Sequence, residues 1–597
     1  MHETHTRRTR ELRVKIGGEA GAGIKAAGQT LARSFADAGL EVCDLTEYPS
    51  LIRGGHNTYF LRVSESPIFS HVRDVDVLIA LNAESVALHL AELAPGAAVI
   101  FDPSDFPADE PPDTGETLAV SVPLKDFARQ AGGIIMRNTV ALGAVLALAD
   151  FPTDYLAASL HAQFAHKSPE IAENNVAAAV LGYEHVKAQN LHLEFTVSPV
   201  PDAPERMLVD GNEAIGLGAL AAGIGFYAAY PMTPASSILH FMARHERDHG
   251  VVVKHAEDEI AVMNMVVGAA FTGARAMCAT SGGGFALMNE ALGMAGTSES
   301  AVVVGVMTRP GPATGMPTWT EQSDLRYVIH AAQGEFPRVV LAPGDQEESF
   351  ELAWKAFNLA DQLQTPVIVL GDTYLSDNRR TVPAFDTSAV TIDRGRIVTE
   401  GDMAQHPEAC DETGRYLRYK LADDGVSTRA LPGVRNALQL ANSYEHDEYG
   451  YGQLGESASV RIAQHEKRMR KLKLAATLVP RPRFFGPSPS EADLAIVCWG
   501  STVGPLREAA ALLEADGVSL AIMQVVTMWP FPADEVSAFM NDAGRTMIVE
   551  GNLTGQLQGL VREQCLIDFD HVIHRIDGRP FSPESIVDEI KEVLAHA

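Results

Sequence analysis

Short apolar runs alternate with stretches of helical periodicity along most of this chain. Residues 75–82, 97–102 and 301–307 combine β-branched and other apolar residues between turn signals, which predicts buried strands. Helical patterns follow such runs, for example at 170–184 and 346–361. Strands that alternate with helices form parallel sheets covered on both faces. The pattern therefore predicts an α/β protein with three α/β domains, mainly parallel sheets, and a connecting arm.

Proline clusters and composition shifts mark the predicted domain boundaries. The segment SPVPDAP contains three prolines in seven residues and has no periodicity, which is typical of a linker. The predicted parts are a tail (1–10), a first α/β domain (11–196), the linker (197–206), a second domain (207–383), an irregular arm (384–485) and a final α/β domain (486–597).

The stretch 226–290 crosses from strand to helix three times. A proline-flanked Thr233 follows the first strand, an acidic helix start with Glu259 follows the second, and Ser281 with a triple glycine (282–284) follows the third. The carboxyl ends of parallel strands share one edge of a sheet, and ligands bind there. A hydroxyl, a carboxylate and the free N–H groups of a helix start suit a polar ligand with an anionic end.

Each of these groups also has a purely structural interpretation. We expect Glu257, Asp258 and Glu259 in the first turn of the helix, where acidic residues complement the helix dipole by about 0.3–1 kcal/mol each. Glu259 differs because a run of apolar and small residues follows it, which places it where the helix enters the core. A buried carboxylate is costly unless something binds it. The triple glycine alone is a weak signal, since it also fits a simple tight turn.

A long loop is expected directly after the strand at 301–307. It reads TRPGPATGMPTWTEQSDL and carries Arg309 near its start, with Thr314, Thr318 and Thr320 farther on. Loops of this length inside a compact domain are usually functional. An arginine beside a proline-fixed turn can hold a carboxylate through two hydrogen bonds.

Two features of the first domain point to anion binding. The glycine-rich turn GGEAGAGI, with Gly21 and Gly23, leads from a strand into a helix and can bind a phosphate through its backbone N–H groups. Its glycine spacing is not that of the dinucleotide fingerprint. The segment RGGH, which begins at Arg53, is either a hairpin turn with a solvated arginine or a contact to an anion or a partner subunit.

Composition excludes several classes of protein. The chain has 597 residues and a formal net charge of −30, which argues against general nucleic-acid binding. It has no apolar run long enough to span a membrane, and its first residues lack the apolar core of a signal peptide, so we expect a cytoplasmic protein. Its five cysteines are not at metal-ligand spacing, so we expect neither an iron–sulfur cluster nor a structural metal in this chain. Cys278 and Cys498 stand in apolar strand contexts and are interpreted as core residues.

The arm ends in a basic helix with the sequence KRMRKLKLAA. Two interpretations remain open from sequence. The arm wraps a neighbouring subunit, or it is a solvated linker.

Several of these motifs, in this order, resemble a known family. YPMTPAS, AEDEIAVMNMVVGAAFTGARAMCATSGGG and RPGPATGMPT resemble the α subunit of 2-oxoacid:ferredoxin oxidoreductases, and the first domain resembles the γ subunit of the same enzymes, here fused ahead of α. RYKLADDGVSTRALPG and YEHDEYGYG resemble the 2-oxoglutarate branch, and the final domain resembles a transketolase C-terminal domain.

The resemblance implies roles for individual residues. The second domain would bind the pyrimidine of thiamine diphosphate, with Glu259 contacting its N1′ atom as the catalytic carboxylate. Further implied contacts are Tyr230, Pro231, Ser281 and Gly282 to the cofactor; Thr233, Arg309 and Thr318 to the substrate carboxylate; and Gly21, Gly23 and Arg53 to coenzyme A. Family members often carry Ser-Gly-Pro-Gly where this chain has SGGG, a change that we expect to affect loop stiffness more than chemistry.

The resemblance also implies partners. The family holds the diphosphate through Mg²⁺ on an Asp and an Asn after a GDG turn, and GDTYLSDN (371–378) only imitates this motif, so no metal ligand is assigned here. A β subunit would supply the Mg²⁺–diphosphate ligands and a [4Fe–4S] cluster, in an (αβ)₂ heterotetramer that reduces ferredoxin. The implied reaction converts 2-oxoglutarate and coenzyme A to succinyl-CoA and CO₂, as in the tricarboxylic acid cycle or in reverse. Pyruvate, branched 2-oxoacids and indolepyruvate are alternative substrates, and a non-catalytic scaffold or regulatory subunit is the alternative of another class.

Overall fold

The computed structural model describes residues 11–51, 54–107, 112–164, 167–195 and 197–595, and the side chains of 453 and 454 are also left undescribed. The chain divides into two compact units. The first contains the chain up to Asp210 together with Asp377–Ala384 and Ser582–Asp588. The second contains Gly211–Ser376, Phe385–Phe581 and Glu589–Ala597.

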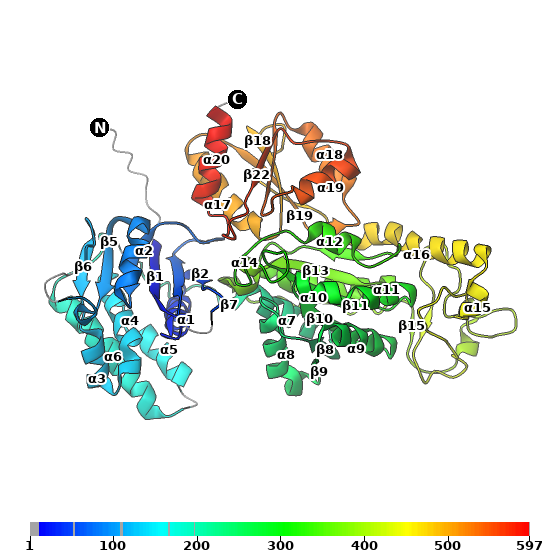
Figure 1. The fold of residues 1–597 in the computed structure, drawn as a ribbon, viewed down its shortest axis with the longest axis horizontal. Helices are drawn as coiled ribbons and strands as arrows, with labels where there is room; N and C mark the ends of the chain where they lie inside the picture. The colour runs from blue at the N-terminus through cyan, green and yellow to red at the C-terminus, as the bar shows by residue number, and fades with distance from the viewer. Residues whose placement is uncertain (1–10, 52–53, 108–111, 165–166, 196, 596–597) are drawn as a thin grey trace. The chain divides into compact units, whose positions relative to one another are not determined.

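An eight-stranded sheet forms the centre of the first unit (Figure 1, mainly blue). The strands from β6 to β1 pair in parallel, whereas β3 pairs antiparallel with both β1 and β2, and β14 pairs antiparallel with β2 and β7. β2 and β3 are consecutive and pair antiparallel as a hairpin, and Gly54 and Gly55 of the RGGH segment lie in its connection, whereas Arg53 lies outside the described residues. In spatial order the strands are β6 (Leu118–Ser121), β5 (Leu93–Phe101), β4 (Val75–Ala80), β1 (Glu11–Glu19), β3 (His56–Ser64), β2 (Glu41–Glu47), β14 (Arg379–Pro383) and β7 (Arg206–Asp210).

The helices of this unit bury small and aliphatic side chains against the sheet and against one another. Almost every residue of α4 is buried. The predicted glycine-rich turn leads from β1 into α1, as expected from the sequence. The helices are α1 (Ile24–Asp37), α2 (Ala83–His89), α3 (Leu124–Ala131), α4 (Arg137–Leu148), α5 (Asp154–Phe164) and α6 (Pro169–Ala188).

A seven-stranded sheet forms the centre of the second unit (Figure 1, mainly green). The strands from β9 to β12 pair in parallel, and β20, which comes from the final part of the chain, adds antiparallel to β12. In spatial order they are β20 (Thr527–Trp529), β12 (Val339–Leu341), β13 (Val367–Asp372), β11 (Val302–Thr308), β10 (Ala276–Thr280), β8 (Phe226–Ala229) and β9 (Val252–His255). The three strand-to-helix crossings predicted in 226–290 are confirmed.

Helices cover this sheet and shape the edge where its strands end. They are α7 (Gly211–Ala221), α8 (Ser236–His249), α9 (Glu259–Phe271), α10 (Gly282–Leu287), α11 (Asn289–Thr297), α12 (Leu325–His330), α13 (Gln346–Leu363) and α14 (Thr373–Asp377). The start of α9 corrects one detail of the sequence analysis. Asp258 is the N-cap, its side chain accepts from the N–H of Ala261, and Glu257 precedes the helix, so only Glu259 lies in the first turn.

A five-stranded sheet completes the second unit (Figure 1, orange and red). Its strands are parallel except for the pair β17·β19, and its apolar side chains join the core that lies under α9 and α10. In spatial order they are β17 (Arg483–Phe485), β19 (Leu520–Val525), β18 (Leu494–Trp499), β21 (Thr546–Glu550) and β22 (His571–His574). The helices of this part are α17 (Val503–Ala515), α18 (Ala533–Asp542) and α19 (Gln556–Cys565), and the last helix, α20 (Pro583–Ala595), is divided between the two units after Asp588. The α/β fold class with mainly parallel sheets is confirmed, and Cys278 and Cys498 are buried as predicted.

The arm contains little regular structure before its basic helix. It includes β15 (Ile397–Val398), β16 (Arg429–Ala430), α15 (Gly452–Gly455) and α16 (Ala458–Leu478). Lys467 and Lys471 of α16 are fully buried in the second unit, so the solvated-linker interpretation is wrong for this helix. Whether the arm also contacts a neighbouring subunit stays a prediction.

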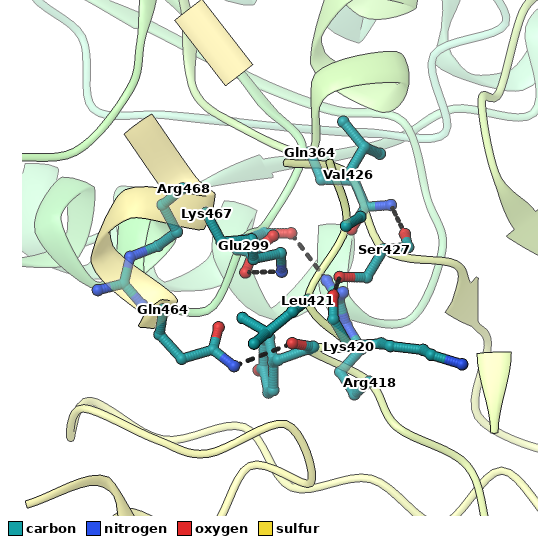
Figure 2. A network of polar contacts seen from close by, with 12 residues as sticks. Glu299, Gln364, Arg418, Lys420, Leu421, Val426, Ser427, Gln464, Lys467 and Arg468 are labelled. Carbon is teal, nitrogen blue, oxygen red and sulfur yellow. Dashed lines mark hydrogen bonds and ion pairs between the residues drawn. The ribbon is translucent and has the colours of Figure 1, made fainter. Parts of the chain in front are cut away.

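The two buried lysines of α16 form ion pairs with one carboxylate, that of Glu299, which Figure 2 shows beside Lys467. Nζ of Lys467 lies 2.6 Å and Nζ of Lys471 2.7 Å from the Glu299 carboxylate. Arg418 donates to the backbone carbonyl of Glu299 at 3.0 Å. Burial opposes ionisation of Glu299, but these three cations outweigh it and hold its pKa well below the ordinary value. The same burial lowers the pKa of Lys467 to about 7, against the attraction of Glu299. The cluster fixes α16 to the loop between α11 and β11.

No helix among the described residues has the length and apolar character needed to cross a membrane.

Candidate active site

The carboxyl ends of β8, β9, β10 and β11 lie at one edge of the seven-stranded sheet. Their parallel registers bring the turns after Ala229, His255, Thr280 and Thr308 to this edge. These turns carry the predicted groups of the second domain, so the sequence placed them at the correct end of the sheet.

Glu259 is the most unusual side chain at this edge. It is 3% exposed, and its Oε1 atom has no hydrogen-bond partner among the described residues. It lies at the first position of α9, where the positive end of the helix dipole favours a negative charge. Since a buried polar atom normally has a partner, the orphaned oxygen marks a place that a ligand can fill.

Gly284 adjoins this carboxylate on the neighbouring turn. A Cβ atom built at Gly284 would collide with Oε1 of Glu259 and with Oγ1 of Thr280. The absence of a side chain therefore creates the room around the carboxylate. Ser281, at the N-cap of α10, is fully buried, and its Oγ also has no partner among the described residues.

Arg309 and Thr233 meet at the same edge. Nη1 of Arg309 donates to the backbone carbonyl of Thr233 at 2.7 Å. Burial lowers the pKa of the Arg309 guanidinium, although it stays a cation at neutral pH. Among the described residues no other group accepts a hydrogen bond from this guanidinium, which leaves its remaining N–H groups available for an anion.

The other predicted residues of this domain take different environments. Thr318 is buried on the same loop as Arg309. Tyr230 and Pro231, which follow β8, are exposed. Gly282, the first residue of α10, packs against the carboxylate of Asp324.

The loop from 309 to 324 is fixed at its far end by Gln322. Its Nε2 donates to the carbonyl of Trp499 at 3.0 Å, and its Oε1 accepts from the N–H of Gly551 at 2.8 Å. Its backbone N–H donates to the carbonyl of Gly551, and its own carbonyl accepts from Nδ2 of Asn552. Sequence reasoning missed this anchor because the partners lie 177 and 229 residues away.

Two carboxylates on this loop have raised pKa values. Burial raises the pKa of Glu321, although hydrogen bonds from Ser323 and from the backbone of Gly311 oppose the shift. Burial and then the charge of Glu321 raise the pKa of Asp324 to about 6. The segment EQSDL contained both acids, but the sequence analysis used only the arginine and threonines of the loop.

The groups assigned to coenzyme A lie in the first unit. Gly21 and Gly23 both have positive φ angles, 86° and 77°, and Gly23 forms the N-cap of α1. Arg53 lies outside the described residues. Their role stays a prediction.

In the segment 371–378, which imitates a metal motif, the Asp372 carboxylate is hydrogen-bonded within the protein. Asp372 is buried, and its carboxylate accepts from Oγ of Ser501 at 2.6 Å and from the N–H of Leu375 at 2.9 Å. Over the described residues, no three His, Cys, Asp or Glu side chains come together as metal ligands.

Comparison with known proteins places these features in a family. Three family models match successive parts of the chain: "Pyruvate ferredoxin/flavodoxin oxidoreductase" at 13–185, "Pyruvate flavodoxin/ferredoxin oxidoreductase, thiamine diP-bdg" at 217–464 and "Pyruvate:ferredoxin oxidoreductase core domain II" at 492–586. The alpha subunit of 2-oxoacid:ferredoxin oxidoreductase 2 from Aeropyrum pernix is 33% identical over 98% of each chain. This chain belongs to the 2-oxoacid:ferredoxin oxidoreductase family.

The names of two further relatives of this oxidoreductase subunit specify 2-oxoglutarate as the 2-oxoacid. Subunit KorA of 2-oxoglutarate oxidoreductase from Mycobacterium tuberculosis is 28% identical, over 98% of this chain and 91% of its own. A 2-oxoglutarate:ferredoxin oxidoreductase from Magnetococcus marinus, solved with 2-oxoglutarate, coenzyme A and succinyl-CoA bound, matches with a TM-score of 0.90. It is 34% identical, over 98% of this chain and 99% of its own.

The geometry of this oxidoreductase subunit fits the pyrimidine end of thiamine diphosphate. The orphaned Oε1 of Glu259 suits a ring nitrogen that can carry a proton. Gly284 lets this carboxylate lie against the turn, since a Cβ there would overlap its Oε1 and displace it. Residues 217–464 are a thiamine diphosphate-binding domain of this family, and its members are oxidoreductases.

Proposed function

We propose that this chain is the fused γα subunit of a 2-oxoglutarate:ferredoxin oxidoreductase. The reaction joins the four-carbon acyl group of 2-oxoglutarate to the thiol of coenzyme A, releases CO₂ and passes two electrons, one at a time, to two oxidised ferredoxins. The observation that carries the proposal is the buried Glu259 carboxylate, whose Oε1 is orphaned beside Gly284. Relatives named for 2-oxoglutarate support this substrate over other 2-oxoacids.

The residues of this chain have distinct tasks in the proposed reaction. When bound, thiamine diphosphate would supply the nucleophile and the electron sink that decarboxylation of a 2-oxoacid needs. Glu259 holds a proton at the aminopyrimidine nitrogen and thereby favours the tautomer that acts as a base. Arg309, already hydrogen-bonded to Thr233, binds the carboxylate next to the oxo group, and Thr318 is the second candidate for that contact.

A second subunit completes the proposed site. Ile260 follows Glu259 directly and is 49% exposed, and Leu287 on α10 is 50% exposed. Exposed large apolar residues beside a buried catalytic carboxylate are typical of an interface. We assign to this partner the Mg²⁺–diphosphate ligands and the [4Fe–4S] cluster, in an (αβ)₂ assembly that binds coenzyme A and ferredoxin.

Co-purification from the native source tests the function. We expect a brown complex with a smaller subunit, which reduces a viologen dye when 2-oxoglutarate and coenzyme A are both present. Pyruvate, branched 2-oxoacids and indolepyruvate, assayed in parallel, decide the substrate by their kcat/KM values. A colourless, partnerless protein that never reduces the dye would favour a scaffold role instead.

A further inference from the structure

A cavity of about 590 Å³ lies in the first unit, beside α1. Residues of α1, α5 and the edge strand β7 line it, together with Arg379 of β14. Cavities of roughly 300–1,000 Å³ with a few convergent polar groups are typical of sites for small molecules. Gly21 and Gly23, the residues of the glycine-rich turn that are assigned to coenzyme A, do not line it. The cavity is therefore separate from that turn.

The charged side chains that line the cavity are mainly cationic. They are the three arginines Arg33, Arg206 and Arg379 and one aspartate, Asp37, with a formal charge of +2. The whole chain, in contrast, has a formal net charge of −30. A cleft lined by one sign of charge concentrates ions of the opposite sign. This cavity therefore favours an anion in a protein that otherwise repels anions.

Arg206, the first residue of β7, has an unused hydrogen-bond donor at this cavity. Its Nη1 lies 2.5 Å from Oε1 of Glu41, with which it forms an ion pair. Its Nε is buried and has no hydrogen-bond partner among the described residues. In an arginine side chain, Nε and the neighbouring Nη2 form a planar fork that holds a carboxylate or a phosphate through two parallel hydrogen bonds.

Ser159 of α5 has a second unused donor. It is 3% exposed, and its Oγ has no partner among the described residues. A hydroxyl inside a helix either faces solvent or donates to the carbonyl four residues earlier. In the neighbouring α1, Thr30 donates in this way to Ala26, and Ser34 to Thr30. The buried Ser159 hydroxyl does neither, so it is available to a ligand.

Two further donors line the cavity from α5 and α1. Oε1 of Gln163 accepts from Oγ1 of Thr30 at 2.7 Å, which leaves its amide hydrogens for another acceptor. Nε of Arg33 lies 3.6 Å from Oδ2 of Asp37, a distance too long for a hydrogen bond. Donors from α1, α5 and β7 thus line one cavity.

We propose that this cavity is a binding site for a small organic molecule that carries an oxyanion, either a carboxylate or a phosphate. Arg206 holds the oxyanion, and Ser159 and Gln163 donate further hydrogen bonds to it. The cavity is larger than a phosphate ion, and its alanines and the strand residues Leu208 and Val209 provide an apolar surface for the body of the ligand. The inference goes beyond the proposed function, because none of the residues assigned to the reaction lines the cavity.

Binding of two probes to the full-length protein, purified with any subunit that accompanies it, tests the proposal. Phenyl phosphate represents the phosphate ligands and benzoate the carboxylate ligands. Thiamine diphosphate and Mg²⁺ are kept in excess, so that the probes do not report the cofactor site. Broadening of the ring proton signals of the probe is followed by NMR. We expect at least one probe to bind with a Kd of about 1 mM or below, and the stronger of the two identifies the preferred oxyanion.

Three variants locate the bound probe. Arg206→Gln should weaken binding about 10- to 100-fold, because it removes a charge-assisted contact, and Ser159→Ala about 2- to 10-fold. Arg129→Gln is the matched control: it removes the same charge from an exposed arginine of α3 in the same unit, outside the cavity, and should leave the affinity unchanged.

The site is refuted if the wild-type protein binds neither probe, or if Arg206→Gln and Arg129→Gln bind the probe equally well. Arg206→Gln also loses the ion pair with Glu41, so it can fail to fold. In that case Ser159→Ala decides, since it removes a single hydroxyl that makes no contact in the folded chain. Weaker binding by Ser159→Ala than by wild type supports the site, and equal binding refutes it.

Discussion

Two buried glutamates of the second unit have opposite environments. Glu299 is completely buried, and two lysine ammonium groups lie within 2.7 Å of its carboxylate. Glu259 is 3% exposed, and one of its oxygens contacts no donor among the described residues. A buried charge must be compensated. The protein compensates Glu299 from within, whereas Glu259 is left for a ligand to compensate.

The comparison separates a structural carboxylate from a functional one. Removing one partner from a buried ion pair costs about 3–5 kcal/mol, because the remaining charge is left uncompensated. Removing a carboxylate that the folded chain itself does not compensate costs the fold little. The same substitution at the two sites should therefore affect stability in one case and chemistry in the other.

Glu259→Gln should give the largest effect, and the effect should be on catalysis. An amide cannot exchange the proton at the aminopyrimidine nitrogen, so we expect the rate to fall about 10²- to 10⁴-fold. Exchange of the thiazolium C2 proton, measured by NMR with bound cofactor, should be lost. The thermal midpoint should stay the same or rise, because a neutral amide replaces an unpaired buried charge. Unchanged C2 exchange would remove Glu259 from its assigned role.

Glu299→Gln should lower the stability of the protein rather than its catalytic rate. It leaves Lys467, Lys471 and Arg418 without their counter-charge, so we expect the free energy of unfolding to fall by about 3–5 kcal/mol, measured by denaturant titration. Glu466→Gln is the matched control, because this exposed glutamate lies on the same α16, and its effect should stay within about 0.5 kcal/mol. Adding Lys467→Met to Glu299→Gln should restore part of the loss. A Glu299→Gln protein as stable as wild type would contradict the comparison.

Arg309→Ala should weaken binding of the oxoacid alone. The loss of a charge-assisted contact to the carboxylate predicts a KM about 10- to 100-fold higher, with the KM for coenzyme A unchanged. Steady-state kinetics with each substrate varied in turn would measure both values. Arg309→Lys should recover only part of the affinity, because an ammonium lacks the planar fork of the guanidinium. An unaltered KM would exclude Arg309 from the substrate site.

Gly284→Ala should have the smallest effect of the four. Its Cβ would overlap Oε1 of Glu259 and Oγ1 of Thr280, so the carboxylate would have to shift, and such overpacking costs about 1–3 kcal/mol. We expect weaker binding of thiamine diphosphate, measured by calorimetry on the complex. Gly283→Ala is the control, since the nearest neighbouring atom to a Cβ there is the carbonyl oxygen of Ala313 at 4.0 Å. Equal affinities of the two variants would mean that the position of the Glu259 carboxylate does not affect binding of the ligand.

Local patterns predicted the part of the site that is built from neighbouring residues. The apolar run after Glu259 signalled its burial, and the order of strands and helices placed Thr233, Ser281 and Arg309 at one sheet edge. The contact between the Asp324 carboxylate and Gly282 was missed because 42 residues separate them in the chain.

Ion pairs between residues far apart in the chain could not be predicted from the sequence. The basic run KRMRKLKLAA has the composition of a solvated helix face, yet its Lys467 meets a carboxylate 168 residues earlier in the chain. The local pattern around Glu299 does not indicate that Lys467 is its partner. For the same reason, no pattern indicated that β20 would extend the central sheet or that Gln322 would bond to residues of the final segment.

The link between β12 and β20 limits how a gene for this protein can be shortened. A chain that stopped before the five-stranded sheet would lack β20 and would leave the backbone edge of β12 open to other strands, which favours aggregation. It would also lack Trp499, Gly551 and Asn552, so Gln322 could no longer fix the loop that carries Arg309 and Asp324. Deletion or separate expression of the final segment would thus remove the anchor of this loop, although none of the residues assigned to the chemistry lies in that segment.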